Sequence, residues 1–117
     1  MEFQAQVELL AESLKQCQKI VEALGDGVRQ HLIIEMIRMN QYEGIRVGEL
    51  AERSNLSRSA VSHHLQILKE AGIVSMRREG TKNYYYFDSY DSCEQLIQVL
   101  RQVQNIERMV QKPTEEV

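Results

Sequence analysis

The 117-residue sequence lacks the features that mark membrane proteins and secreted proteins. No apolar run approaches the roughly 18 residues that a membrane-spanning helix needs. The first residues, MEFQAQVELLAE, have neither the basic start nor the continuous apolar core of a signal peptide. The length and the 43% share of hydrophobic residues suit one packed core. We therefore expect a single cytoplasmic domain over residues 1–112, followed by a frayed tail at 113–117.

Cysteines and catalytic motifs are also scarce. Cys17 and Cys93 stand far apart, without CxxC or Cys/His ligand spacing. This pattern predicts reduced thiols and indicates neither a disulfide framework nor a zinc module. The sequence has no phosphate-binding glycine loop, no nucleophile elbow and no pair of carboxylates suited to catalysis. We therefore do not expect an enzyme, and no cofactor is predicted.

Positive charge is scarce overall but is concentrated in the middle of the chain. The formal net charge is −3, which by itself argues mildly against nucleic acid as a partner. Residues 46–82, however, contain seven Lys or Arg against four Glu, so this segment alone has a charge of +3. The acidic residues lie mainly in the two flanks. The distribution therefore favours a basic surface in the central segment.

Apolar periodicity predicts a mainly α-helical protein of about five helices with one small β-hairpin. The helices are expected at about 3–24, 28–39, 47–54, 58–71 and 91–111. Two β-prone runs within residues 73–88, joined by EGTK, predict the hairpin. The last helix is expected to begin at a capping box of Asp91 and Glu94 or of Ser92 and Gln95. Steps of four and three place one apolar seam on the first helix, formed by Phe3, Val7, Leu10, Leu14, Cys17, Val21 and Leu24.

Residues 47–71 read as a helix-turn-helix. Two short helical patterns flank the turn SNLS, and Ser57 stands at the N-cap position of the second helix. The core face of that helix is expected at Val61, Leu65 and Leu68. Its outer face lacks the Glu and Lys pairs that are common on a solvated helix. It carries groups that can bond to base edges and phosphates, namely Arg58, Ser59, Ser62, His63 and Gln66.

The predicted hairpin follows directly and is basic at its turn. Arg77, Arg78 and Lys82 surround the turn, and three consecutive tyrosines follow at residues 84–86. The tyrosines can offer hydroxyl groups or support the sheet. A basic hairpin after a recognition helix indicates a winged helix, whose wing contacts the DNA backbone. An ordinary surface hairpin is the alternative.

Three stretches resemble the ArsR/SmtB family of bacterial and archaeal winged-helix repressors: ALGDGVRQHLI, VGELAERSNLSRSAVSHHLQILKEAGIV and RREGTKNYYYF. The resemblance spans about residues 23–88. It implies a homodimer that pairs through its first and last helices, binds a partly palindromic double-stranded DNA operator and leaves it when an inducer is sensed. By this likeness the recognition helix carries Ser57, Arg58, Ser59, Ser62, His63, His64 and Gln66, and the wing carries Arg77, Arg78 and Lys82.

The standard metal sites of that family do not fit this sequence. Metal-sensing members have cysteines in the helix before the recognition helix, where this chain has VGELAERS, or Asp and His pairs on the last helix, which here has no histidine. Such metals need thiolate or imidazole ligands at fixed spacing, so no metal site is expected. We expect His31 at the surface or in a second layer, His63 facing DNA, and His64 in a packing or backbone contact.

The sequence leaves one alternative open for the two thiols and one for the function of the whole protein. Cys17 lies on the apolar seam and is expected to be a packing residue. The alternative is a thiol switch, in which oxidation or persulfidation of Cys17 and Cys93 changes DNA binding, or arsenite binding by the same thiols. For the whole protein, the alternative to a DNA-binding repressor is a winged helix that binds other proteins. Such a module would expose apolar surface where a repressor gathers positive charge.

Overall fold

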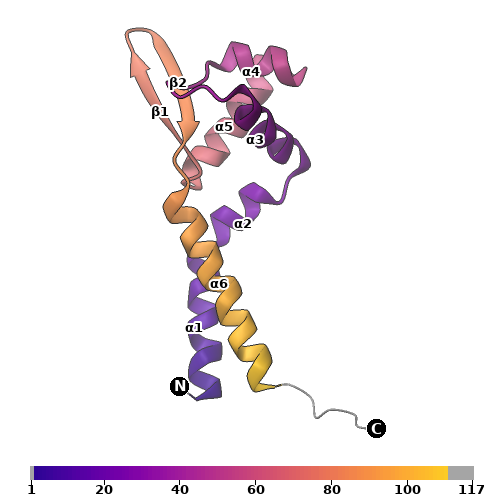
Figure 1. Cartoon of the computed structure of the whole chain (residues 1–117), viewed down its shortest axis with the longest axis vertical. Helices are drawn as coiled ribbons and strands as arrows, with labels where there is room; N and C mark the ends of the chain where they lie inside the picture. Colours follow the sequence, from indigo (N-terminus) through magenta and orange to yellow (C-terminus); the bar gives the residue numbers. More distant parts are fainter. Residues whose placement is uncertain (1, 111–117) are drawn as a thin grey trace.

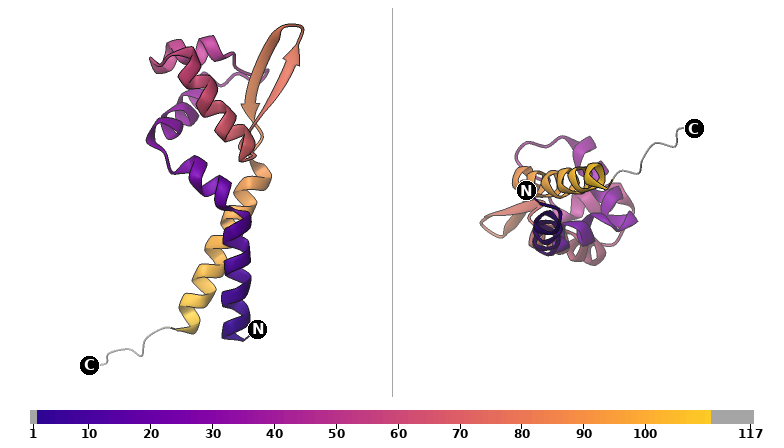
Figure 2. Two further views of the ribbon diagram at one scale, coloured as in Figure 1. Left: turned by 180° about the vertical axis from the view of Figure 1, so that it is seen from behind. Right: turned by 90° about the horizontal axis from the view of Figure 1, so that it is seen from below.

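The computed structural model describes residues 2–110, which form a head carried on a two-helix stalk (Figure 1). The molecule measures 62 × 31 × 23 Å. Helices α1 and α6 lie side by side in the stalk, and the two-stranded hairpin lies at the opposite end of the molecule (Figures 1 and 2). No helix within this range is long and apolar enough to cross a membrane. The elements are α1 (Phe3–Gln16), α2 (Gln18–Leu24), α3 (Gly27–Met39), α4 (Val47–Ser54), α5 (Arg58–Glu70), β1 (Val74–Glu79), β2 (Lys82–Phe87) and α6 (Tyr90–Met109).

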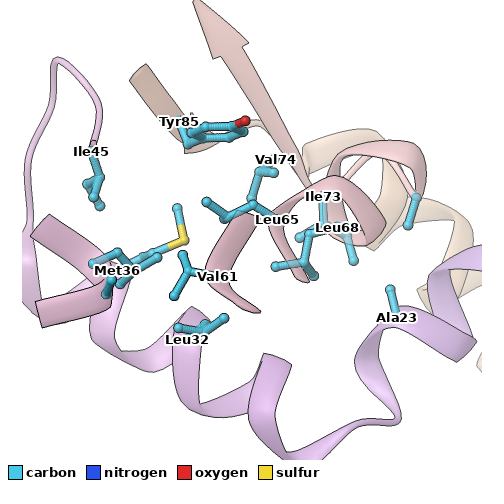
Figure 3. Packing of buried hydrophobic residues seen from close by; sticks show 13 residues of the cluster. Ala23, Leu32, Met36, Ile45, Val61, Leu65, Leu68, Ile73, Val74 and Tyr85 are labelled. Carbon is cyan, nitrogen blue, oxygen red and sulfur yellow. The ribbon is translucent and has the colours of Figure 1, made fainter. Parts of the chain in front are cut away.

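One apolar core holds the head together (Figure 3). Val61, Leu65 and Leu68 form the inner face of α5, as the periodicity predicts, and each is at most 1% exposed. They pack with Leu32 and Met36 of α3. Burying a side chain of this size stabilises the fold by about 1.5–3 kcal/mol. The packing therefore fixes the rotation of α5 and turns its polar face outward.

The prediction of one unbroken helix over residues 3–24 is wrong. The helix breaks at Cys17, whose φ and ψ are −96° and 3°, so the described chain has six helices instead of five. Cys17 is buried with Ile20 and with Val99 of α6. Beyond the break, α2 contacts α6 on one side and α3 and α5 on the other, and Ala23 joins the core of the head. Val21, a member of the predicted seam, is 46% exposed in the single chain.

The predicted start of the last helix is also wrong. Ser89 is the N-cap residue of α6 and makes no side-chain capping bond, so neither predicted capping box forms. The buried hydroxyl of Ser92 instead donates to the carbonyl oxygen of Gly72 at 2.6 Å and lies 3.3 Å from that of Ala71. Gly72 adopts a φ of +76° just after α5, where the sequence predicted the helix to stop. The expected helix end at 111 and the tail at 113–117 lie outside the described residues.

The hairpin is attached to the head by a short segment that the sequence did not predict. Strands β1 and β2 pair antiparallel, from Val74 opposite Phe87 to Glu79 opposite Lys82. On the outer side of β2, Ile45 and Tyr85 exchange two backbone hydrogen bonds of 2.8 and 2.9 Å. Gly44 precedes this bridge with a φ of +110°, and a Cβ there would lie 2.8 Å from the Cβ of Tyr84. Only glycine suits this close approach.

A buried carboxylate joins α3 to α4. The Glu35 carboxylate accepts a hydrogen bond from Nε of Arg53 at 3.0 Å and from Nη1 of Arg38 at 2.8 Å. The bond from Arg53 is the main cause that lowers the pKa of Glu35 below its ordinary value. The first helix of the helix-turn-helix is thereby tied to the helix that precedes it.

Candidate nucleic-acid interface

The two helices of the helix-turn-helix are α4 and α5. Asn55 ends α4 in the left-handed conformation, with a φ of 62°, and the chain turns there toward α5. Ser57 is the N-cap residue of α5, and its hydroxyl oxygen accepts a hydrogen bond from the backbone N–H of Ala60 at 3.1 Å. Both features follow local rules, because asparagine tolerates a positive φ and serine satisfies a free N–H at a helix start. The start of the recognition helix is therefore well defined.

The outer face of α5 is polar and exposed along its length. Ser62 makes no side-chain hydrogen bond to any residue in the described range, so its hydroxyl is available to a ligand. The hydroxyls of Ser57 and Ser59 lie 3.3 Å apart, and the Gln66 amide donates to the Glu70 carboxylate at 3.1 Å. All members of the predicted set except His64 are exposed: Ser57, Arg58, Ser59, Ser62, His63 and Gln66.

His64 lies on the side of α5 and contacts the protein itself. Its Nδ1 atom is 3.2 Å from Nη1 of Arg29. A guanidinium group can only donate, so this imidazole nitrogen is the acceptor and carries no proton. Burial of the ring lowers the pKa of His64 below its ordinary value of 6.5, and the charge of Arg29 acts in the same direction. This agrees with the prediction of a packing contact and removes His64 from the outer face.

Arg29 connects α5 to the end of α2. Its Nε atom donates to the Ala23 carbonyl oxygen at 2.8 Å, and Nη2 donates to that of Glu22 at 3.2 Å. These carbonyl groups belong to the last turn of α2, where helical N–H donors run out, and that of Glu22 also accepts from the backbone N–H of Gly25 at 3.3 Å. Asp26 caps the start of α3 by accepting from the Arg29 N–H at 3.1 Å, which lowers the pKa of its carboxyl group. The Arg29 side chain thus links α2 to the recognition helix α5.

The hairpin separates the three basic residues that were predicted to act together. Successive side chains of a strand point to opposite faces, so Arg77 and Arg78 cannot lie on one face. Lys82 pairs with Glu79 at the turn and shares the face of Arg77. The Arg77 guanidinium donates to the Glu79 carboxylate and to the Glu43 carbonyl oxygen, both at 2.9 Å. Arg77 is thus half-buried and engaged within the protein, while Arg78 and Lys82 are exposed, although Nε of Arg78 donates to the Gly80 carbonyl oxygen at 3.0 Å.

Sequence reasoning missed a cluster around Tyr84. The guanidinium carbons of Arg77 and Arg46 lie 5.0 and 5.6 Å from the centre of the Tyr84 ring. Tyr84 and Arg46 also line a cleft of about 840 Å³ between α4 and the hairpin, together with Arg58 and acidic residues such as Glu49. Because the residues are 38 positions apart, only the fold brings Arg46 to Tyr84. The cluster places a further cation between the recognition helix and the wing.

The two thiols occupy different environments. Cys17 is buried at the break between α1 and α2, and Cys93 is exposed on the first turn of α6. Both are free thiols. His31 is exposed on α3, as expected. Within residues 2–110, no group of three or more His, Cys, Asp or Glu side chains is gathered so that it could hold a metal ion.

Comparison with known proteins identifies the same region. Residues 42–76, from the loop after α3 into β1, match the family described as "Bacterial regulatory protein, arsR family". An uncharacterized HTH-type transcriptional regulator of Methanocaldococcus jannaschii is 36% identical over 75 residues, which are 64% of this chain and 81% of that protein. The transcriptional repressor SdpR of Bacillus subtilis is 33% identical over 66 residues, 56% of this chain and 69% of that protein.

A solved structure extends the likeness beyond the helix-turn-helix. It is the homodimeric winged helix-turn-helix DNA-binding domain of a possible ArsR-family transcriptional regulator from Mycobacterium bovis. The two structures agree with a TM-score of 0.60 at 26% identity, over 91% of this chain and 93% of that one. The fold, the family match at residues 42–76 and the identity to regulators along most of their length all indicate the same family. The chain belongs to the ArsR family of bacterial regulatory proteins.

Proposed function

We propose that this chain is a transcriptional repressor that binds a DNA operator as a homodimer and releases it when an inducer binds. The observation that carries the proposal is the exposed polar face of α5, held outward by the buried face opposite. Ser59, Ser62, His63 and Gln66 would read base edges in the major groove, because each can donate or accept a hydrogen bond there. Arg58 at the start of the helix would bind a phosphate.

The wing would add phosphate contacts beside the recognition helix. Arg78 and Lys82 are the exposed cations at its turn, on opposite faces of the hairpin. A narrow hairpin with a cation on each face suits a DNA groove, because the phosphate backbones of the two strands lie on either side of it. Such contacts raise affinity for all sequences and do not select among them. Arg77 would support the wing from within.

A homodimer is supported by the apolar residues that a single chain leaves uncovered on the stalk. Long apolar side chains at least 37% exposed lie on both stalk helices: Phe3, Leu9 and Leu14 on α1, and Ile97, Leu100, Val103 and Met109 on α6. Surface of this kind is typical of an interface between subunits. The Mycobacterium bovis relative is described as homodimeric. A two-fold dimer would present two copies of α5 to a partly palindromic site.

The distribution of apolar surface favours DNA over a protein as the partner of the exposed polar face of α5, which we call the reading face. Within the described range, every exposed large hydrophobic residue lies outside α4, α5 and the hairpin. A protein-binding winged helix would need apolar side chains on that face. The face instead offers hydroxyls, an amide, an imidazole and cations.

The proposal can be tested by selecting bound sequences from random DNA with the full-length chain. A partly palindromic operator is the expected product. With that operator, Ser62→Ala should lose about 1–3 kcal/mol of binding free energy and should bind random DNA almost as well as wild type. Gel-shift titrations on both DNAs measure the difference, and Ser13→Ala on the stalk is the matched control. Equal losses on both DNAs would make Ser62 a phosphate contact, and failure to select any sequence would refute operator binding.

A further inference from the structure

A small apolar cavity, open to solvent at the side of Ile37 and Cys93, lies where the stalk meets the head. Its volume is about 280 Å³, and its walls come from α2, α3, the end of β2 and the first turns of α6. Most of the lining is aliphatic or aromatic: Ile20, Leu24, Ile33, Ile37, Phe87 and Leu96. The reading face of α5 contributes no residue to it. The cavity is therefore separate from the proposed DNA-binding surface.

The lining of the cavity disfavours a charged ligand. No Asp, Glu, Lys, Arg or His borders the cavity. A metal ion or a charged metabolite would lose its hydration there without gaining a partner, which is strongly unfavourable. The polar lining groups are Ser89, Ser92 and Cys93, and the Ser92 hydroxyl is already donated to the Gly72 carbonyl oxygen. The Cys93 thiol donates to the Ser89 hydroxyl oxygen across 3.9 Å. The Ser89 O–H therefore remains available to donate to a ligand.

The size of the cavity sets the size of the ligand. An apolar protein cavity of about 150 Å³ holds one benzene molecule. The cavity here is somewhat less than twice as large, which suits one substituted ring or two fused rings. It is too small for a helix or an extended peptide. The chemistry therefore fits an uncharged, mainly apolar ring compound with one polar atom directed at Ser89.

The position of the cavity gives such a ligand a way to act on DNA binding. Within residues 2–110, α6 packs against α1 and α2 but makes no close backbone contact with α3. The cavity occupies the space between α3 and α6. A ligand that fills it would contact both helices and favour the angle between the stalk and the head that is seen here over other angles. In a dimer joined through the stalks, that angle sets the separation of the two recognition helices.

We propose that this cavity binds a small, uncharged, mainly apolar ring compound, and that its occupation lowers the affinity for the operator. The second part rests on the proposed function, because it identifies the chemical class of the inducer. A ligand can shift the protein only through a difference in affinity between its two states. The cavity supplies that difference if its width differs between the DNA-bound dimer and the free dimer.

Indole is a suitable probe, because the chain contains no tryptophan, so indole can be excited at wavelengths longer than those that the five tyrosines absorb. Full-length wild type should bind indole and toluene saturably, and should not bind benzoate, a charged molecule of similar size. Cys93→Phe should weaken indole binding by about tenfold or more, because the new ring fills the cavity. Glu94→Phe, which adds the same ring outside the cavity, should bind indole as wild type does. Ile37→Phe at the rim tests the site again if Cys93→Phe does not fold.

Operator binding then tests the coupling. Indole should weaken operator affinity of wild type and of Glu94→Phe by about fivefold or more, and should leave Cys93→Phe unaffected. Absence of indole and toluene binding to the wild-type dimer would overturn the proposal, since partner side chains would then fill the cavity. Binding that weakens equally in both phenylalanine variants, or binding without any effect on operator affinity, would also overturn it. If the chain binds no DNA but binds indole in the cavity, the proposed function fails and the site stands.

Discussion

Arg29 is the residue that joins the recognition helix to the rest of the head. It satisfies two carbonyl oxygens at the end of α2 and donates toward Nδ1 of His64 on α5. The contact with His64 requires an unprotonated acceptor nitrogen. Protonating the neutral ring at Nδ1, so that both nitrogens carry a proton, would place two cations against each other and remove the acceptor. The orientation of α5 is therefore linked to the protonation state of one histidine.

We predict that His64 makes the stability of the protein depend on pH. Burial of the ring lowers its pKa below the ordinary value of 6.5, so below that value the unfolded chain binds more protons than the folded one. The free energy of unfolding should then rise with pH up to about 6.5, and this contribution should be lost as the pH falls through that window. Urea denaturation between about pH 5 and about pH 8 measures the slope.

The matched variants for this prediction are His64→Gln and His31→Gln. The first should show a shallower rise of stability with pH than wild type, because the half-buried ring is absent. The second removes an exposed imidazole from α3 that is not among the groups acting on His64, and it should keep the slope of wild type. Identical slopes in wild type and His64→Gln would show that His64 is not the group responsible.

Cys17 is expected to act through packing. Its side chain is 1% exposed, and it lies between Ile20 and Val99. Cys17→Ala should lower the free energy of unfolding by about 1 kcal/mol or more, because buried atoms are lost and a cavity remains. Chemical denaturation measures the loss. Reversible release of the operator by an oxidant, abolished in Cys17→Ser and Cys93→Ser, would instead establish the thiol switch.

Residues whose environment follows from helical periodicity could be predicted, and residues whose partners are distant in sequence could not. Val61, Leu65 and Leu68 recur at steps of four and three, and each is buried. The burial of Glu35 could not be predicted from a local pattern, because its partner Arg53 is 18 positions away. Ser92 was assigned to a capping box because its spacing fits one, but its hydroxyl donates to a carbonyl oxygen 20 positions earlier.

At the scale of elements, the hairpin was predicted correctly but its attachment was not. The β-prone runs and the turn signal locate β1 and β2, since both signals are local. The bridge from Ile45 to Tyr85 pairs a loop with a strand 40 positions later, so no local pattern announces it. The break at Cys17 has a similar origin, because packing against α6 and the head bends a segment with continuous helical periodicity.

The arrangement of the wing gives a prediction for its three basic residues. Arg78→Ala and Lys82→Ala should each reduce the slope of log affinity against log salt by about 1, on the operator and on random DNA alike. The two effects should add, since Arg78 and Lys82 lie on opposite faces of the hairpin and would each contact a different phosphate. Arg77→Ala should instead lower the stability of the hairpin, because it loses the bonds to Glu79 and Glu43.

Fluorescence anisotropy at several salt concentrations measures these slopes, and thermal denaturation measures the effect of Arg77→Ala. Thr81→Ala changes the hairpin turn without altering charge and serves as the control. An unchanged slope in both Arg78→Ala and Lys82→Ala would remove the wing from the DNA interface.

At the scale of the whole molecule, the stalk separates assembly from recognition. The exposed apolar residues lie mainly on α1 and α6, far from the hairpin (Figures 1 and 2). Leu100→Glu or Val103→Glu should therefore prevent dimerisation and leave the head folded. Operator affinity should fall by about 100-fold or more, because the two half-sites are no longer bound together. Sedimentation and circular dichroism check mass and fold, with Gln104→Glu as the control. Full dimerisation of both glutamate variants would place the interface elsewhere.

The bridge between Ile45 and Tyr85 also bears on the conformational entropy of DNA binding. A two-stranded hairpin alone is only marginally stable in water, and an untethered wing would sample many orientations before it met a phosphate. Fixing the backbone of one residue costs about 1–2 kcal/mol, so ordering such a wing at the moment of binding would consume much of what its cations gain. Here the two backbone bonds order β2 during folding. In the proposed complex the wing would therefore meet DNA already ordered, and most of the free energy of its phosphate contacts would be kept as affinity.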